Sequence, residues 1–599
     1  GGSGSADIIN IGSIAPSLGG TLANIYGAIT ITNQSGANVT LDDSADANNV
    51  TGTLDTNSIT GFGLPTILDF TGSQLASLTI LQGVGSNTVN INDTAASKTV
   101  IRPSLLVSTV NVLATTEPLT LDGTSGKGQA GVDINIGSTA PSLGGTLANI
   151  QGAVSVTNFS KSDLTLDDSG DSADQAGTLT ATAISGFGMG GDVTYAGKEL
   201  SGLKIIGGTG DVTFNVHDTS AATTLENNSI PGTFNIRATD APLTIDGQKL
   251  AAVINVGTQA PSLTGTLLRI LAPITIANTS KESNLNLDDS ADTFGEAGQI
   301  TPAAITGFGM SPKASINYSQ NQKLAVAVHN GRGVNKITVT GDSGSIDLVG
   351  RPEANNTLIG PNKKVTWDIN GVNSGSIPAI NLTFSDIRHL VGGSLADTFA
   401  MMDGGSISGS IDGGTGKNAL DYSGGWTGNV LVNLHTGNAS GITGNKSLSN
   451  IQIVNGATGG GSGFYNILLG AGQDTLTGGD GRTNLLEAGG SGGTLQGGDQ
   501  NDILIGGTTT YDKQVDAHSF IAIMALWSTS TQSYASLVTA INTGAGVPAL
   551  SKKTAHNSGK NITLLAHNGS TLDLNLYFGA ALTQPSDLDS AAGEQFILI

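Results

Sequence analysis

The sequence contains three copies of one unit, and this internal repetition constrains the fold more than any other feature of the chain. Three strings recur in the same order: APSLGGTL or APSLTGTL from Ala15, Ala140 and Ala260, LDDS from Leu41, Leu166 and Leu287, and GFG from Gly61, Gly186 and Gly307. A fixed period indicates one supersecondary unit that recurs along the chain. We therefore expect repeat 1 over 6–130, repeat 2 over 131–250 and a divergent repeat 3 over 251–350, after a linker or mature N-terminus at 1–5.

Within each copy, apolar and polar side chains alternate with a period of two residues, as in VDINI at 132–136 and VTFNVH at 212–217. Such alternation predicts short strands with one buried face. Glycine supplies 87 of the 599 residues and aromatic residues only 4%, a composition that suits tight corners around a narrow core. We predict an all-β fold, an elongated and right-handed parallel β-solenoid of the β-helix or β-roll type. Tandem β-sandwich domains are the alternative, because a unit of about 120 residues suits them in length.

The pattern changes after residue 350. Short strands continue over 351–510, but Gly-Gly pairs now separate them. We expect a Gly-rich solenoid region at 351–462 and nine-residue turns at 463–510. From 511 to 599 we expect a C-terminal α+β cap with two short helices and strands. Two sets of apolar residues have helical spacing there: Phe520, Ile523, Met524 and Trp527, then Tyr534, Leu537, Val538 and Ile541.

The Gly-Gly segments carry the strongest chemical signal, because they approach the calcium-binding pattern GGxGxDxUx. The segments read LGAGQDTLT from Leu469, GGDGRTNLL from Gly478, GGDQNDILI from Gly497 and, more weakly, GGSLADTFA from Gly392. In the second segment Thr483 stands where aspartate is expected. Hard oxygen ligands suit calcium, so the candidate ligands are Asp474, Asp480, Asp499, Asp502 and Asp397. The alternative is a dry coil held only by apolar ladders.

A second acidic cluster recurs in the three repeats. Its candidate ligands are Asp43, Asp168 and Asp289, each the second aspartate of an LDDS string. These carboxylates could hold calcium, but a solvated turn in which aspartate caps its own backbone is favoured, because no glycine pattern supports a metal site.

Charge and missing motifs exclude several functions. The net charge is -22 with only 25 Lys and Arg residues, so the chain lacks the basic surface that nucleic acids require. Apolar runs such as Ile521–Trp527 are too short for membrane insertion. The sequence has no GxSxG, HExxH, P-loop or dinucleotide fingerprint. We therefore expect no enzyme activity, with a β-helix polysaccharide-degrading enzyme as the weaker alternative.

The nine-residue turns resemble those of the RTX family of secreted proteins. The repeats resemble very large, haemagglutinin-like or adhesin-like exoproteins of planctomycetes, on strings such as DINIGSTAPSLGGTLANIQGAV from Asp133 and FNIRATDAPLTIDG from Phe234. This resemblance implies export and an extracellular or cell-surface location, with which the absence of cysteine agrees. We predict a structural or adhesive protein that assembles into a homo-oligomer, filament or surface layer, with calcium as the candidate cofactor. A carbohydrate-binding adhesin, with a cell-surface glycan as partner, is the alternative.

Overall fold

The computed structural model describes residues 7–32, 36–104, 106, 108–123, 131–280, 282–319, 324–341, 344–444, 446–565, 574–579 and 595–599. The expected linker at 1–5 lies outside these residues. The chain forms two compact units, unit 1 of Gly1–Ala291 and Pro302–Ala327 and unit 2 of Asp292–Thr301 and Val328–Ile599. The third repeat contributes to both units, so the units do not follow the repeat boundaries.

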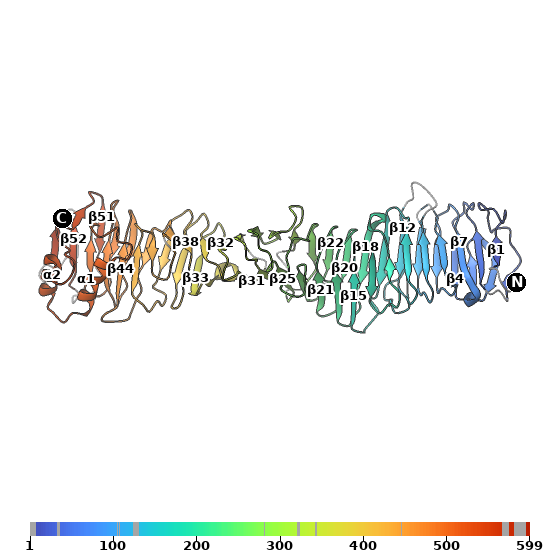
Figure 1. The fold of residues 1–599 in the computed structure, drawn as a ribbon, viewed down its shortest axis with the longest axis horizontal. Helices are drawn as coiled ribbons and strands as arrows, with labels where there is room; N and C mark the ends of the chain where they lie inside the picture. Colours follow the sequence, from blue (N-terminus) through green and yellow to red (C-terminus); the bar gives the residue numbers. More distant parts are fainter. Residues whose placement is uncertain are drawn as a thin grey trace. The chain divides into compact units, whose positions relative to one another are not determined.

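In unit 1 the chain passes back and forth between two sheets, which Figure 1 shows as rows of stacked strands. The first sheet contains β1 (Ile8–Ile11), β3 (Ala37–Asp42), β7 (Leu75–Leu81), β9 (Thr99–Arg102), β11 (Leu119–Asp122), β13 (Val154–Thr157), β15 (Gln175–Leu179), β16 (Ala183–Gly186), β17 (Val193–Thr194), β19 (Val212–Val216), β21 (Gly232–Ile236), β23 (Ala252–Val256) and β25 (Asn284–Asp288).

The second sheet contains β2 (Ile29–Ile31), β4 (Thr51–Asp55), β5 (Ser58–Gly61), β6 (Leu64–Phe70), β8 (Thr88–Ile91), β10 (Ser108–Val112), β12 (Val132–Ile136), β14 (Ser162–Asp167), β18 (Leu200–Ile206), β20 (Thr223–Glu226), β22 (Leu243–Asp246), β24 (Ile274–Ala277), β27 (Ala304–Gly307) and β28 (Ile316–Asn317). Two 3-10 turns, η1 (Gly72–Gln74) and η2 (Gly197–Glu199), join strands, and β29 (Ala325–His329) crosses the division between the units.

Apart from the hairpin strands, the strands pair in parallel with strands one coil away, and inward side chains stack into ladders. Thr223 of β20 lies beside Leu243 of β22, so the shortest coils here take 20 residues. One ladder consists of aliphatic residues that are at most 2% exposed: Leu166, Ile205, Leu225, Ile245 and Ile276. The all-β prediction is confirmed, and the long, mainly parallel sheets are compatible with a β-solenoid. Among the described residues of unit 1, antiparallel pairing, which builds β-sandwiches, is found in short hairpins such as β15–β16–β17.

Successive repeats begin in different sheets. β1 of repeat 1 and β23 of repeat 3 belong to the first sheet, whereas β12, the equivalent strand of repeat 2, belongs to the second. The APSL loop therefore runs from the first sheet to the second in repeats 1 and 3, and the other way in repeat 2. The repeat carries an odd number of passes between the sheets, so its motifs alternate between the two sides of the coil.

The GFG motif inserts one phenylalanine per repeat into the core. Phe62, Phe187 and Phe308 have positive φ angles of 53°, 50° and 53° and are at most 1% exposed. Glycines make room for two of these rings, since a methyl group on Gly52 or Gly177 would overlap the ring of Phe62 or Phe187. The motif therefore encodes a left-handed turn that points an aromatic ring inward.

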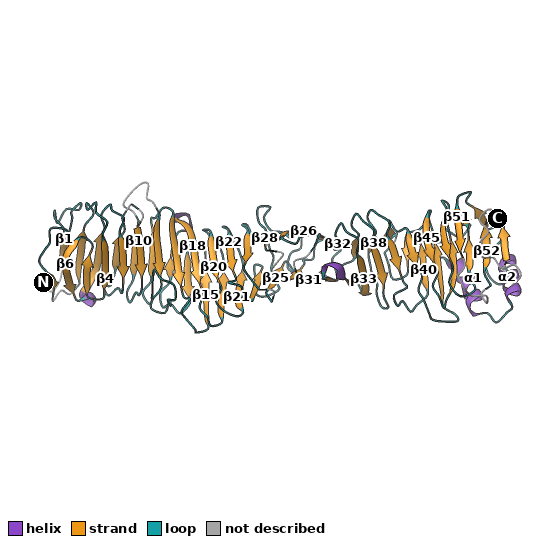
Figure 2. Cartoon of the chain, turned by 180° about the vertical axis from the view of Figure 1, so that it is seen from behind, coloured by secondary structure: helices purple, strands orange, loops and turns teal. Residues whose placement is uncertain are grey.

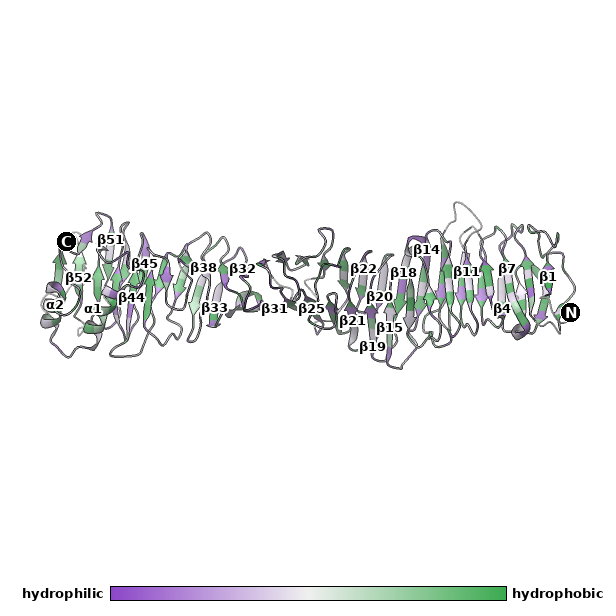
Figure 3. Ribbon diagram, in the orientation of Figure 1, coloured by the Kyte–Doolittle hydropathy of each residue, from purple (hydrophilic) through white to green (hydrophobic). Residues whose placement is uncertain are grey.

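Unit 2 continues with short parallel strands, and Figure 3 shows hydrophobic and hydrophilic residues alternating along the strands. Its strands are β26 (Ala297–Ile300), β30 (Lys336–Val339), β31 (Ile346–Val349), β32 (Thr357–Ile359), β33 (Thr366–Gly371), β34 (Ser374–Ile377), β35 (Leu382–Ser385), β36 (His389–Val391), β37 (Thr398–Met401), β38 (Ser410–Asp412), β39 (Ala419–Asp421), β40 (Val430–Asn433), β41 (Asn438–Ala439), β42 (Leu448–Ser449) and β43 (Ile453–Asn455). A 3-10 turn, η4 (Pro378–Ile380), precedes β35.

The Gly-Gly region and the C-terminal segment complete unit 2. Their strands are β44 (Tyr465–Leu469), β45 (Asp474–Thr477), β46 (Thr483–Glu487), β47 (Gly493–Gln496), β48 (Ile503–Ile505), β49 (Gly507–Thr509), β50 (Ala555–Asn557), β51 (Ile562–Leu565), β52 (Leu576–Gly579) and β53 (Gln595–Leu598).

Two helices lie where the apolar spacing predicts them, α1 (His518–Thr529) and α2 (Tyr534–Thr543). Ser533 caps the start of α2 through the N–H of Ser536, and Gly544 ends it in a left-handed conformation. Phe520, Met524 and other apolar residues of the helices share a core with Leu485 and Ile503 of the coils, and Figure 2 shows the helices in purple beside the last strands. Neither helix of the described ranges has the length and apolarity to cross a membrane.

Candidate functional site

The Gly-Gly coils of unit 2 have the period that their sequence pattern predicts. Tyr465 of β44 lies beside Thr483 of β46, and Leu485 lies beside Ile503 of β48, so one coil takes 18 residues, or two nine-residue turns. The side chain equivalent to Asp502 is that of Asn484, one residue after Thr483, and the coil before it has Asn466 in this place.

These equivalent side chains form a buried polar ladder. Asn466 Nδ2 donates to Asn484 Oδ1 at 2.8 Å, and Asn484 Nδ2 donates to Asp502 Oδ1 at 2.9 Å. The backbone N–H of Asp502 donates to Asn575 Oδ1 at 2.7 Å. All four residues are at most 2% exposed. The ladder satisfies polar groups that would otherwise be costly to bury.

The carboxylates of three calcium candidates, Asp502, Asp474 and Asp397, cap backbone N–H groups. Asp502 Oδ2 accepts from the N–H of Gly498 at 2.6 Å, and Asp474 Oδ2 accepts from two N–H groups of its own turn at 2.8 Å each. Asp397 accepts from Gly393 at 2.7 Å. Burial raises the pKa of Asp474 and of Asp397 above the ordinary value, while these hydrogen bonds act in the opposite direction. At these three positions the carboxylates therefore act as caps of their own turns.

Asp480 and Asp499 lie at corresponding positions of neighbouring Gly-Gly turns. Asp499 Oδ1 accepts from the N–H of Gly481 at 2.5 Å, and the side chain of Asp480 is exposed. Across the described ranges, no three His, Cys, Asp or Glu side chains come together as a group that could hold a metal ion.

A buried arginine lies at a corner of the Gly-Gly coils, and sequence reasoning missed it. Arg482 is only 1% exposed. Its Nε donates to the carbonyl of Gly459 at 2.7 Å, its Nη1 to that of Gly428 at 2.6 Å, and its Nη2 to that of Trp426 at 2.9 Å. Its guanidinium carbon lies 5.4 Å from the centre of the Phe464 ring. Burial lowers the pKa of Arg482, but an arginine keeps its charge in proteins. The only signal in the sequence was a charged residue at a variable position of the turn.

In the three repeats the two aspartates of the LDDS string accept hydrogen bonds from backbone N–H groups at the end of the APSL loop. Asp42 Oδ2 accepts from the N–H of Gly20 at 2.7 Å and Asp43 Oδ1 from that of Leu22 at 2.8 Å. The same two bonds recur from Gly145 and Leu147 to Asp167 and Asp168, and from Gly265 and Leu267 to Asp288 and Asp289. The recurrence of all three pairs indicates that these aspartates hold the loop in place.

Two of these aspartates have carboxyl groups with a raised pKa. Asp43 and Asp168 are at most 1% exposed, and the Oδ2 atom of each is buried without a hydrogen-bond partner. Burial raises the pKa of both to about 7, against the opposing effect of the N–H of Leu22 or Leu147, and neighbouring aspartates add to the rise. Both carboxyls are therefore neutral over much of the acidic range.

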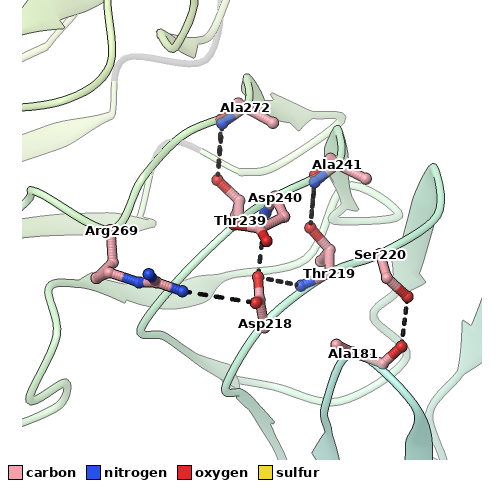
Figure 4. A network of polar contacts seen from close by, with 9 residues as sticks. All are labelled: Ala181, Asp218, Thr219, Ser220, Thr239, Asp240, Ala241, Arg269 and Ala272. Atoms are coloured by element: carbon pink, nitrogen blue, oxygen red, sulfur yellow. Dashed lines mark hydrogen bonds and ion pairs between the residues drawn. The ribbon is translucent and has the colours of Figure 1, made fainter. Parts of the chain in front are cut away.

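A second polar network, shown in Figure 4, ties three neighbouring corners of unit 1 together. Asp218 accepts from the N–H groups of Thr219 at 2.8 Å and Asp240 at 3.0 Å. Thr239 Oγ1 donates to the carbonyl of Ala272 at 3.0 Å, and Arg269 approaches Asp218 at 3.8 Å. Burial raises the pKa of Asp218. The Asp-Thr pair of this network, Asp218-Thr219, has a counterpart in the sequence at Asp93-Thr94. The partners of such a pair lie about one coil away along the chain, so the spacing of residues did not reveal the network.

A polar groove of about 520 Å³ crosses the outer face of β45, β47 and β51. Thr475, Thr494 and Thr563 lie side by side in register along it. Lys417 and Lys560 also line the groove. The groove offers hydroxyl groups and two lysine charges beside the buried carboxyl of Asp474, in a chain of net charge -22.

Compared with known proteins, the chain matches no protein-family model, and no curated protein is significantly similar to it.

Proposed function

We propose that this protein is a secreted, non-catalytic structural or adhesive repeat protein, a right-handed parallel β-solenoid that assembles end to end into an extracellular fibre or surface layer. One observation supports this most. Within the described residues β1 pairs with β3 alone, and Ile8 on β1 is 75% exposed. An edge strand of this kind is a template for a further strand.

The edge itself can be tested. Ile8→Lys adds a charge to the edge strand, and charged edges discourage pairing between chains. Val84→Lys is the matched control, because Val84 is exposed at 44% and does not lie on β1. Electron microscopy and sedimentation of concentrated protein should show fibres or layers for the wild type and for Val84→Lys, and dispersed molecules for Ile8→Lys. Dispersed wild-type molecules with and without calcium would refute the proposal.

Calcium is the candidate cofactor of this assembly. Asp480 is the most exposed of the candidate ligands, and the partly exposed Asp499, which accepts from the N–H of Gly481, lies on the neighbouring turn. An ion that binds only the folded form raises the melting temperature. Melting in calcium and in chelator, with Asp480→Asn/Asp499→Asn as the variant, tests this contribution independently of the β1 edge.

The second candidate function is a carbohydrate-binding adhesin, which the groove of Lys417 and Lys560 favours. The occupant that best complements two lysines and a row of threonine hydroxyls is an acidic glycan. Isothermal titration of the full chain with polyuronate oligosaccharides should show binding that Lys417→Ala and Lys560→Ala weaken. The exposed Lys313 is distant in sequence and lies in unit 1, so Lys313→Ala serves as the control. Equal binding by all variants would contradict this function.

A further inference from the structure

We propose that the guanidinium of Arg482 is the built-in cation of the Gly-Gly coils, so that the corners around it hold together without calcium, and any calcium of the proposed assembly binds at the surface carboxylates of Asp480 and Asp499. The proposal rests on the geometry of the arginine and is independent of the proposed assembly. It concerns the set of backbone carbonyls that surrounds the guanidinium, here called the carbonyl cradle and formed by Trp426, Thr427, Gly428 and Gly459.

The cradle provides ligands of the kind that a hard cation takes. Its four carbonyl oxygens accept from Arg482 over 2.6 to 3.4 Å. Calcium in proteins is held by backbone carbonyl and carboxylate oxygens. A charge buried in this way must be compensated by hydrogen bonds or by an opposite charge. Among the ion pairs of the described residues none includes Arg482, so the carbonyl dipoles supply the compensation.

The arginine also connects three successive corners, as a bound ion between turns would. Gly428 lies just before β40, Gly459 before β44 and Arg482 directly before β46. These three strands are neighbours in one sheet. The Phe464 ring beside the guanidinium adds an attraction between the cation and the aromatic face.

Two consequences follow for calcium. A divalent ion cannot enter the carbonyl cradle while the guanidinium occupies it, because like charges repel at this distance. In addition, Asp474 and Asp502 already accept from backbone N–H groups, so the turns have both a cation and their caps without an ion from solution. Coil corners that need no calcium would differ from the calcium dependence that the resemblance to RTX proteins implies.

The test uses the full chain and hydrogen exchange of peptides that cover the carbonyl cradle. Four proteins are compared in millimolar calcium and in chelator: the wild type, Arg482→Lys, Arg482→Met and the control Arg332→Ala. Arg482→Met removes the charge at similar volume, and Arg482→Lys keeps it. Arg332 has a side chain that is 61% exposed, so its removal lowers the net charge without touching the cradle.

We expect the wild type and Arg332→Ala to show the same protection in calcium and in chelator. Arg482→Met should lose protection in these peptides by about tenfold or more, the change that loss of one hydrogen bond to a charged group produces. Arg482→Lys should lie between them. Loss of wild-type protection on chelation would overturn the proposal, and so would wild-type protection in Arg482→Met. If Arg482→Met does not fold, the wild type in chelator and Arg482→Lys still decide the question.

Discussion

The space above Gly177 permits a sharp test of how the GFG motif builds the core. A methyl group on Gly177 would lie 1.8 Å from Cε2 and 2.1 Å from Cζ of Phe187. The Phe187 ring cannot move freely, because its centre lies 5.4 Å from that of Phe214, which stacks on Phe234 at 4.8 Å. Gly177→Ala should therefore displace Phe187 from the core.

The size of the effect follows from these distances. Carbon atoms in contact lie about 3.5 to 4.0 Å apart, so the ring must move by about 2 Å to admit the methyl group. Overpacking costs about 1 to 3 kcal/mol if the core adjusts, and losing a buried phenylalanine costs about 3 to 5 kcal/mol. We expect Gly177→Ala to lower the free energy of unfolding of this part of unit 1 by about 3 kcal/mol.

Hydrogen exchange in increasing urea measures this free energy locally, for peptides over β15 and β19. Local measurement is needed because long repeat arrays do not always unfold in one step. Gly27→Ala is the control, because nothing lies within 4 Å of the added methyl group. In the Phe187→Ala background, Gly177→Ala should cost little, because the ring that it strikes is gone. A cost in the wild-type background no larger than that of Gly27→Ala, or strict additivity in the double variant, would refute the reasoning.

Three further predictions concern buried polar groups. Burial raises the folded-state pKa of Asp43 and Asp168 to about 7, above the ordinary 3.8. The stability that their protonated form contributes is therefore fully present below about pH 3.8 and is lost as the pH rises through about 7. Asp43→Asn and Asp168→Asn should thus raise the melting temperature at pH 8 and flatten its dependence between pH 4 and 8 in scanning fluorimetry, whereas an unchanged profile would disprove this. Asp502→Ala should leave the N–H of Gly498 uncapped and cost about 2 kcal/mol in urea unfolding, with Asp502→Asn milder; equal losses would contradict a role for charge. Trp527→Phe removes the 2.7 Å bond from Nε1 to a backbone carbonyl beside β48 and should cost about 1 kcal/mol, read from faster exchange in α1; unchanged exchange would count against it.

Local patterns in the sequence predicted the strands, the two helices and the coil length of the Gly-Gly region. The alternation in VDINI at 132–136 is a local property, since successive side chains of a strand point to opposite faces. The buried strand β12 lies at these residues. The nine-residue spacing likewise became the 18-residue offset between Tyr465 and Thr483.

The partners of the polar side chains could not be predicted, because they lie one coil or more away. Whether Asp43 meets solvent, an ion or the N–H of Leu22 depends on how the APSL loop stacks on the LDDS strand, about 20 residues apart. The same holds for Arg482, whose acceptors lie in two earlier corners of the chain.

By itself, the sequence determined that this chain forms many short strands from a repeated unit with small corners and thin aliphatic ladders. Only the tertiary structure decided that repeat 2 enters the sheets in the opposite order from repeats 1 and 3. It also decided that aspartates cap loops and that an arginine occupies the carbonyl cradle. The physical reason is range: alternation acts between neighbouring residues, whereas sheet order, capping and charge compensation depend on the register between coils.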